Sequence, residues 1–193
     1  MNLNHDKKFI KNYFQNLFKI IYSRYNYNEK LIELKKKIKK VSKKNKKLIF
    51  VGNGGSAATS SHATVDFTKN AKIKSINFNE SDLITCFSND YGYENWIKEA
   101  LKFYGEKGDL LVIFSCSGKS KNLINAANYA KKSKIDLVTF TGISENNLLK
   151  KINKNGLNFF IPSKSYNQIE ITHHLLILLA VDLCIGKKIY PPN

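Results

Sequence analysis

The sequence predicts an α/β fold with a parallel sheet, formed as one domain with a helical arm at its start. Five short apolar runs alternate with segments of helical periodicity, which is the pattern of repeated βαβ units. Such units connect parallel strands through right-handed crossovers. The length of 193 residues suits a single domain and is sufficient to bury a hydrophobic core.

The helical arm is predicted over residues 1–46, and together with the α/β domain of residues 47–193 it forms one structural unit. Apolar residues recur every three or four positions from Asp6 to Lys46, which predicts two amphipathic helices broken near residues 25–28. The aromatic first helix precedes every strand and has little sheet to cover. We therefore expect it to pack against another subunit.

The α/β domain alternates between predicted strands and helices. The predicted strands span residues 47–51, 72–78, 109–114, 136–141 and 157–161. The predicted helices span residues 56–69, 81–88, 94–104, 120–132, 145–152 and 166–185. In parallel sheets of this kind, ligands bind beyond the carboxyl ends of the strands, where the direction of winding reverses.

Two turns rich in glycine and serine follow the first and third predicted strands. Residues 51–56 read Val-Gly-Asn-Gly-Gly-Ser, and their glycines allow the backbone to approach a ligand closely. Residues 115–120 read Ser-Cys-Ser-Gly-Lys-Ser, whose hydroxyls and following helix amides can hold a phosphate group without a metal. Both turns fall at the same edge of the sheet, so they predict one site for a phosphorylated sugar.

Each turn also fits part of a nucleotide-binding motif but lacks a residue that the motif requires. Residues 52–57 fit the dinucleotide fingerprint loosely, yet no acidic residue follows the second strand before Glu80. Residues 118–120 match the end of a P-loop, yet Ile113 stands where that motif needs glycine. We therefore expect no nucleotide cofactor.

The formal net charge of +17 raises the question of nucleic-acid binding. The lysines gather in residues 35–47, but Arg24 is the only arginine, and specific readers of nucleic acid depend on arginine for bidentate base contacts. Lys, Asn, Ile, Phe and Tyr are all abundant and share AT-rich codons. The charge therefore indicates a solvated surface, and we do not expect a nucleic-acid partner.

The remaining composition predicts a cytoplasmic protein. The longest apolar run, residues 175–183, is about half the length that a bilayer span requires, and the N-terminus lacks a signal-peptide pattern. The three cysteines are odd in number and widely spaced, which argues against a disulfide framework or a cysteine-based zinc site. We therefore expect no association with a membrane.

Four segments together resemble the sugar isomerase (SIS) domain family, and within it the phosphoheptose isomerases. They are Gly52-Asn53-Gly54-Gly55-Ser56-Ala57-Ala58 with His62, Asn89-Asp90-Tyr91-Gly92-Tyr93-Glu94, Ser115-x-Ser117-Gly118-x-Ser120, and Thr141-Gly142. The resemblance covers most of the chain. It implies a three-layer α/β/α sandwich with a five-stranded parallel sheet, similar to flavodoxin, and a homotetramer with active sites at subunit interfaces.

The resemblance also implies a reaction and a set of binding residues. These enzymes convert sedoheptulose 7-phosphate to D-glycero-D-manno-heptose 7-phosphate through an enediol, at the entry to the heptose units of bacterial lipopolysaccharide and capsule. The positions that match those holding the phosphate are Ser115, Cys116, Ser117 and Ser120. The positions that match the rest of the substrate site are Asn53, Gly54, Gly55, Ser56, Asn89 and Asp90.

The catalytic positions match the family less closely. The family carries His and Glu four residues apart on the first helix of the domain, and Gln and His eight apart on the last, often around zinc. His62 and Asp66 match the first pair, and an ungapped alignment puts Glu170 at the Gln position and Leu178 at the His position. The resemblance thus implies that His62, Asp66 and Glu170 are the catalytic residues and the ligands of one Zn²⁺ per subunit.

Other residues of the last helix fit only under different alignments. The ungapped alignment adds His173 to the cleft. His174 would supply an imidazole only if the helix were shifted by roughly one turn, and Gln168 would supply the amide only with a two-residue slip. Both histidines adjoin the apolar residues 175–179, where a histidine is more often a packing residue. Lys119 is a further departure, because the family usually has Asn there.

Two other functions remain open. The protein can be a non-catalytic SIS protein that binds a sugar phosphate and acts on a protein partner, since Leu178 replaces a catalytic histidine and the arm is basic and aromatic. It can also be an isomerase for a different phosphorylated sugar or amino sugar.

Overall fold

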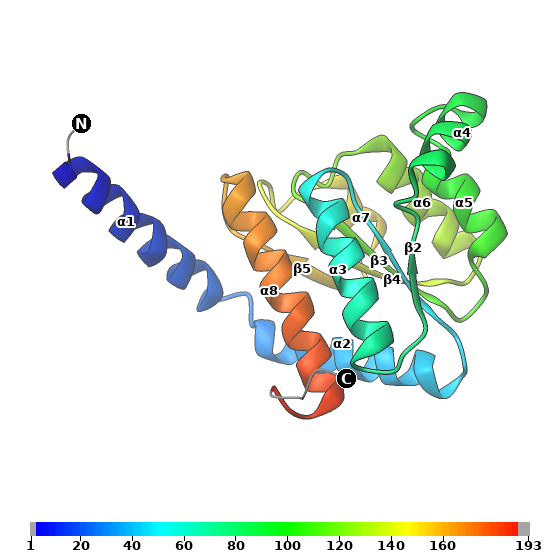
Figure 1. Ribbon diagram of the computed structural model, residues 1–193, viewed down its shortest axis with the longest axis horizontal. Helices are drawn as coiled ribbons and strands as arrows, with labels where there is room; N and C mark the ends of the chain where they lie inside the picture. The colour runs from blue at the N-terminus through cyan, green and yellow to red at the C-terminus, as the bar shows by residue number, and fades with distance from the viewer. Residues whose placement is uncertain (1–2, 189–193) are drawn as a thin grey trace.

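The computed structural model describes residues 3–188 and shows a three-layer sandwich from which one helix projects (Figure 1). The sheet has five parallel strands in the order β2-β1-β3-β4-β5. The strands are β1 (Leu48–Val51), β2 (Ser75–Asn77), β3 (Leu110–Ser115), β4 (Asp136–Thr141) and β5 (Leu157–Phe160). The predicted α/β fold with a five-stranded parallel sheet is therefore confirmed.

The helices cover both faces of the sheet. They are α1 (Leu3–Ile21), α2 (Tyr27–Lys43), α3 (Gly55–Lys69), α4 (Ser81–Tyr91), α5 (Trp96–Tyr104), α6 (Lys121–Lys132), α7 (Leu148–Ile152) and α8 (Tyr166–Ile185). Side chains of α2, α3 and α8 pack in one core cluster, and those of α5, α6 and α7 pack in the other. The sheet separates the two clusters.

The central strand β3 shows why the sheet lies between two layers. All of its residues are buried. Leu110, Val112 and Phe114 face the α2, α3 and α8 layer, whereas Leu111 and Ile113 face the opposite layer. A strand that is buried on both faces needs a continuous apolar run, which is the pattern that the sequence shows here.

Residues 1–46 contain two helices, of which α1 extends away from the body of the described chain (Figure 1). Ile20 is the buried residue of α1. By contrast, α2 buries Leu31, Leu34 and Ile38 in the core beside α8. Asn26, in the left-handed conformation, separates the two helices and caps α2 through its side chain.

Two elements differ in length from their predictions. The strand β2 is shorter than residues 72–78 because the chain is still turning back from α3: Lys72 has a φ of 55°, and the amide of Ile73 donates to the carbonyl of Phe67. The helix α4 extends to Tyr91 and therefore includes the motif residues Asn89 and Asp90 in its last turn.

The closing helix α8 is, by length and composition, the one described helix that could cross a membrane. It is a core helix in this fold. Ile169, Leu176, Ile177 and Val181 are buried in the cluster that also contains α2 and α3.

Stacked phenylalanines at the centre of the sheet make the core sensitive to truncation. The Phe140 ring lies parallel to Phe159, with ring centroids 4.3 Å apart, and 4.9 Å from Phe114. We predict that Phe140→Ala lowers the free energy of unfolding by about 3–5 kcal/mol, because it leaves a cavity that the rigid sheet cannot fill. Urea unfolding measures this loss. Phe103→Ala, at an exposed position of α5, should change stability by less than about 0.5 kcal/mol, and equal losses in the two variants would contradict the prediction.

Candidate functional site

The sheet order brings the two turns together. The strands β1 and β3 are parallel neighbours, with Val51 at the end of β1 opposite Ile113, which lies two residues before the end of β3. The chain leaves β1 toward β2 on one side, whereas the strands after β3 continue on the other, so the winding reverses between β1 and β3. The glycine loop (residues 51–56) and the serine loop (residues 115–120) therefore meet at the position where such sheets bind ligands.

A small cavity of about 160 Å³ lies between the two loops. Its walls are formed by Asn53, Ser56, Phe114, Ser115, Cys116, Ser117, Ser120, Leu123, Tyr166 and Glu170. The structure thus brings Asn53 and Ser56 of the glycine loop together with the four predicted phosphate-binding residues. It adds Glu170 and Tyr166 from α8.

The glycine loop needs glycine at specific positions. Gly54, the N-cap of α3, has a φ of 56°, a conformation that other residues adopt only with strain. A Cβ added to Gly52 would lie 2.6 Å from the backbone of Ser56. The loop can therefore turn sharply into α3 only with these small residues.

A pair of amides joins the glycine loop to α6. The Asn53 amide donates to Asn122 Oδ1 at 3.1 Å, and the Asn122 amide donates back to Asn53 Oδ1 at 2.9 Å. Tyr93 adds a hydroxyl that donates to Asn53 Oδ1 at 3.3 Å. Asn122 is buried, so this reciprocal pair fixes Asn53 at the cavity wall.

The serine loop is held by its own hydroxyls and by Asn147. Ser115 Oγ accepts a bond from the Gly118 amide, and Ser117 Oγ accepts one from the Lys119 amide, both at 3.2 Å. Gly118 has a φ of 62° and lies directly against the side chain of the buried Asn147. Ser120 precedes α6 without capping it through its side chain, which leaves its hydroxyl for a ligand.

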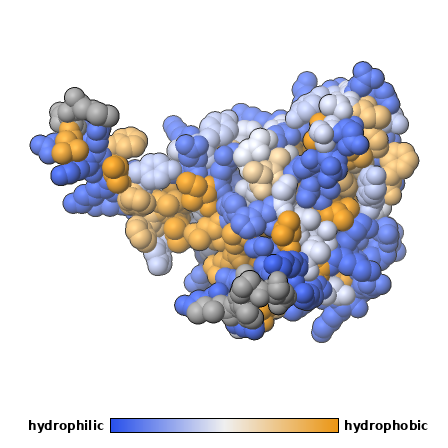
Figure 2. All heavy atoms as spheres, viewed as in Figure 1, coloured by the Kyte–Doolittle hydropathy of each residue, from blue (hydrophilic) through white to orange (hydrophobic). Residues whose placement is uncertain are grey.

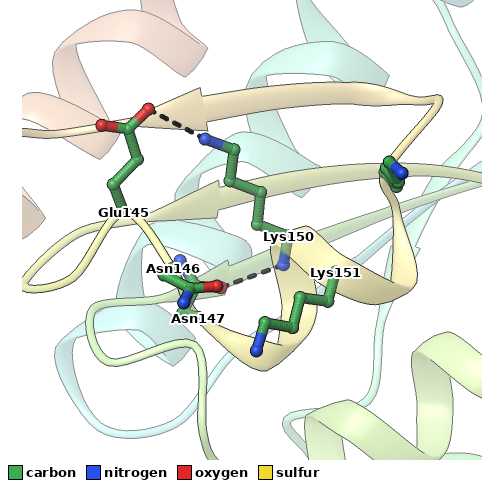
Figure 3. A pocket seen from close by; sticks show the side chains of 6 residues that line it. Glu145, Asn146, Asn147, Lys150 and Lys151 are labelled. Carbon is green, nitrogen blue, oxygen red and sulfur yellow. Dashed lines mark hydrogen bonds and ion pairs between the residues drawn. The ribbon is translucent and has the colours of Figure 1, made fainter.

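A larger hollow of about 580 Å³ lies beside α7 (Figure 3) and shares no lining residue with the cavity between the loops. Its lining includes Glu145, Asn147, Lys150 and Lys151, with Lys150 Nζ 2.9 Å from Glu145 Oε1. Asn147 Oδ1 also accepts the Lys150 amide at 2.9 Å and so caps α7. The hollow is therefore connected to the site through Asn147, whose side chain also lies against Gly118 of the serine loop.

Glu170 reaches from α8 across the cavity. Its carboxylate lies where a Cβ on Gly55 would be, so the absence of a side chain at residue 55 makes room for it. Cys116 Sγ lies 3.8 Å from Glu170 Oε1. Burial, and then the Glu170 charge, raise the pKa of the Cys116 thiol to about 11, so the thiol is protonated at neutral pH and donates to the carboxylate.

Two histidines and an aspartate meet where α3 and α8 face each other. His174 Nε2 lies 2.8 Å from His62 Nδ1, and His62 Nε2 lies 3.5 Å from Asp66 Oδ2. Burial, and then the neighbouring His62, lower the pKa of His174, whereas Asp66 opposes the shift. The predicted pair of His62 and Asp66 on one helical face is present, and His174 joins it without any shift of the helix.

His173 does not lie in the cleft as the alignment predicted. Its ring is buried between Phe114 and Phe140, and its Nε2 contacts the Thr141 carbonyl at 3.3 Å. Burial lowers the pKa of His173 to about 4, so the ring is neutral. His173 is therefore a packing residue of the core. His174 is not, because the side chains of adjacent helix residues point about 100° apart.

The donor set expected for zinc does not come together in this chain. Both nitrogens of His62 face protein partners, and Glu170 is directed toward Gly55 and Cys116. Among residues 3–188, no group of three or more His, Cys, Asp or Glu side chains is arranged to hold a metal ion. The residues present do not fit a zinc site as described.

Asn89 and Asp90 are exposed in the last turn of α4 and do not line the cavity, although they were expected to contact the sugar. They bond to each other at 3.0 Å, through the Asn89 amide and Asp90 Oδ1. The residue of this motif that reaches the glycine loop is Tyr93.

The sequence did not reveal Asn122 and Tyr166 at the site, and it admitted His174 only with a shifted helix. The four-residue spacing of Tyr166, Glu170 and His174 would have indicated two of these residues, because residues spaced by four share a helical face.

Comparison with known proteins agrees with this architecture. A family model described as the SIS domain matches residues 12–142. Among relatives in sequence, a phosphoheptose isomerase from Sulfurimonas denitrificans is 32% identical and covers 95% of this chain and 97% of its own length. One from Buchnera aphidicola is 31% identical over 88% of this chain and 96% of its own.

Two solved structures share the fold. A phosphoheptose isomerase from Neisseria gonorrhoeae matches with a TM-score of 0.84 and 23% identity, covering 93% of this chain and 98% of its own. One from Francisella tularensis matches with a TM-score of 0.86 and 20% identity, covering 94% and 99%.

The protonated state of Cys116 leads to a labelling prediction. At pH 8 we expect iodoacetamide to modify Cys116 far more slowly than the exposed Cys86, because only about one thiol in a thousand is ionised three pH units below its pKa. The rate at Cys116 should rise as pH approaches 11. Glu170→Gln removes the second cause of the raised pKa and should speed labelling of Cys116 but not of Cys86. Mass spectrometry follows both sites, and equal rates at pH 8 would contradict the assignment.

Proposed function

Because the chain belongs to the SIS domain family, with phosphoheptose isomerases as its relatives along nearly its whole length, we propose that it isomerises sedoheptulose 7-phosphate to the corresponding aldose phosphate. The observation that supports this most is the cavity between the glycine and serine loops, bordered by Glu170 of α8 and by Ser56 of α3, the helix that also carries the His62 and Asp66 pair. It combines an anion site with groups that transfer protons.

The serine loop binds the phosphate in this proposal. Ser117 and Ser120 present hydroxyls to the cavity, and the N-terminus of α6 adds the positive end of a helix dipole. Lys119 is an exposed residue of this loop and contributes a positive charge near the dianion. Asn53, held by Asn122, faces the sugar.

The conversion of a ketose to an aldose needs a base that removes a proton beside the carbonyl and an acid that protonates its oxygen. Glu170 and the His62 and Asp66 pair supply carboxylate and imidazole groups on two helices that border the cleft. The proposal assigns no step to a metal ion, because the donor groups of the described chain are not gathered around one point. We further propose that the product supplies heptose units for lipopolysaccharide or capsule.

The cellular setting is proposed from the cysteines. Cys86, Cys116 and Cys184 are all free, and Cys86 is exposed. Free exposed thiols persist in reducing compartments, which supports the cytoplasm as the site of action.

A homotetramer with active sites at its interfaces is proposed from the surface of α1. Apolar side chains gather along the projecting arm and where it joins the body (Figure 2). The exposed members of this apolar stripe are Leu3, Phe9, Ile10, Phe14, Phe18 and Tyr22. A helix with such a stripe in water needs a partner surface, and copies of this chain offer matching stripes.

A non-catalytic role is the second candidate. It is favoured by Leu178, which continues the α8 face of Glu170 and His174 and carries no ionisable group. In that role the protein binds a sugar phosphate without turnover and acts on a protein partner. An isomerase for another phosphorylated sugar is a variant of the first proposal.

We predict that the purified protein converts sedoheptulose 7-phosphate to an aldose, detected by NMR of the sugar carbons. Ser120→Ala should raise KM, with a loss of about 1–3 kcal/mol in binding, because one phosphate contact is removed. Asp66→Asn should reduce kcat. The distant Lys107→Gln, in the turn before β3, should change neither. Tight binding without product would reject the isomerase proposal and support the non-catalytic one. Turnover of another phosphorylated sugar, but not of sedoheptulose 7-phosphate, would show that the other sugar is the substrate.

We predict that the double substitution Phe14→Asp with Phe18→Asp dissociates the assembly, because two charges would be buried in the apolar contact. Light scattering after gel filtration measures the mass. The matched control is Asn12→Asp with Gln15→Asp, which adds the same charge on the polar face of α1 and should leave the mass unchanged. A wild-type protein that is monomeric would contradict the proposal.

A further inference from the structure

The face of α8 that borders the cavity continues past it to His174. Tyr166, Glu170 and His174 are spaced by four residues and so share one side of the helix. The first two line the cavity, and the helical rise places His174 about 6 Å further along the axis than Glu170. On α3, His62 lies about 9 Å along the axis from Ser56, which also lines the cavity. The two imidazoles thus lie about 6 Å and about 9 Å along the helix axes from residues that line the cavity, and an extended sugar chain can span these distances from the serine loop.

The hydrogen-bond arrangement leaves one nitrogen of this pair available. His62 Nε2 faces Asp66 Oδ2 at 3.5 Å. His62 Nδ1 lies 2.8 Å from His174 Nε2, so one of these two nitrogens donates to the other. His174 Nδ1 is the nitrogen of the pair for which, within residues 3–188, the structure shows no hydrogen bond. His62 has both nitrogens turned to protein partners.

We propose that His174, rather than His62, is the imidazole that contacts the reacting end of the sugar, and that His62 and Asp66 position it. This proposal rests on the proposed isomerisation. The proton removed from the carbon beside the carbonyl passes to His174 Nδ1, and the C–H electron pair becomes the C=C bond of the enediol. A proton is then returned from His174 Nδ1 to the neighbouring carbon, after exchange with water in a fraction of turnovers, while a proton moves between the two oxygens, so no other reactant is needed.

The position of His174 also explains how the site can work although Leu178 occupies the position of the family's closing-helix histidine. Leu178 is the next residue on the same face of α8, one turn beyond His174. Its side chain can form an apolar wall but can neither donate nor accept a proton. His174 supplies the imidazole one turn closer to Glu170 and to the phosphate loop.

The kinetic test compares three glutamine variants, because glutamine keeps hydrogen-bonding groups but does not transfer protons. His174→Gln should lower kcat on the order of 10²- to 10⁴-fold with KM nearly unchanged, and should abolish exchange of the substrate C–H with D₂O. His62→Gln should lower kcat less, because it acts through His174. His5→Gln, which removes an imidazole from α1, is the matched control and should leave both constants unchanged. If the wild type is active and His174→Gln retains its rate and its exchange, the proposal is overturned.

A binding test separates this proposal from the proposed function. In the ¹⁵N spectrum of histidine-labelled wild type, sedoheptulose 7-phosphate should shift the His174 Nδ1 resonance, whereas inorganic phosphate, which fills only the serine loop, should not. If the His174 resonance is unchanged when the sugar phosphate is bound, the proposed contact between His174 and the sugar is rejected, whether or not turnover occurs. A shifted resonance in a protein that shows no turnover supports the contact and rejects the isomerase function.

Discussion

The parallel pairing of β1 with β3 is the interaction on which the site depends. Its register sets Val51 beside Ile113, so the glycine loop and the serine loop leave the sheet side by side. Each loop then enters a helix on a different layer, α3 on one face and α6 on the other. The reciprocal amide bonds between Asn53 and Asn122 close the gap between those layers. The cavity is thus a consequence of strand order, and the side chains only line it.

The closing helix supplies the other half of the site through one of its faces. Ile169, Thr172, His173 and Leu176 are buried, whereas Glu170 and His174 lie on the side toward α3. The burial of the first set fixes the rotation of α8 about its axis, because the core is close-packed. The apolar residues therefore decide which histidine enters the cleft. A one-residue shift would exchange the roles of His173 and His174.

The sequence was sufficient for the order of elements along the chain and for the two loops, and less so for α8. Apolar runs and glycine-rich turns report local structure, and the crossover rule then places them on one sheet edge. The rotation of α8 depends on contacts with Phe114 and Phe140, which come from strands far away in the chain. Alignment to the family put His173 in the cleft because matching letters do not record which side of the helix is packed. Asn122 was missed for a similar reason: its partner lies 69 residues away.

The position of Glu170 favours one orientation of a sugar phosphate in the cavity. A carboxylate and a phosphate dianion repel each other, and the repulsion is strong where water is excluded. The anion is therefore best placed against Ser117 and Ser120 at the start of α6, where the helix dipole favours it and where Lys119 lies on the solvent side. In the proposed binding mode, Glu170, whose carboxylate lies 3.8 Å from the neutral Cys116 thiol, then faces the uncharged hydroxyls of the sugar. In the proposed binding mode, a phosphorylated sugar therefore enters with its phosphate in the serine loop and its chain running along α8 toward His174.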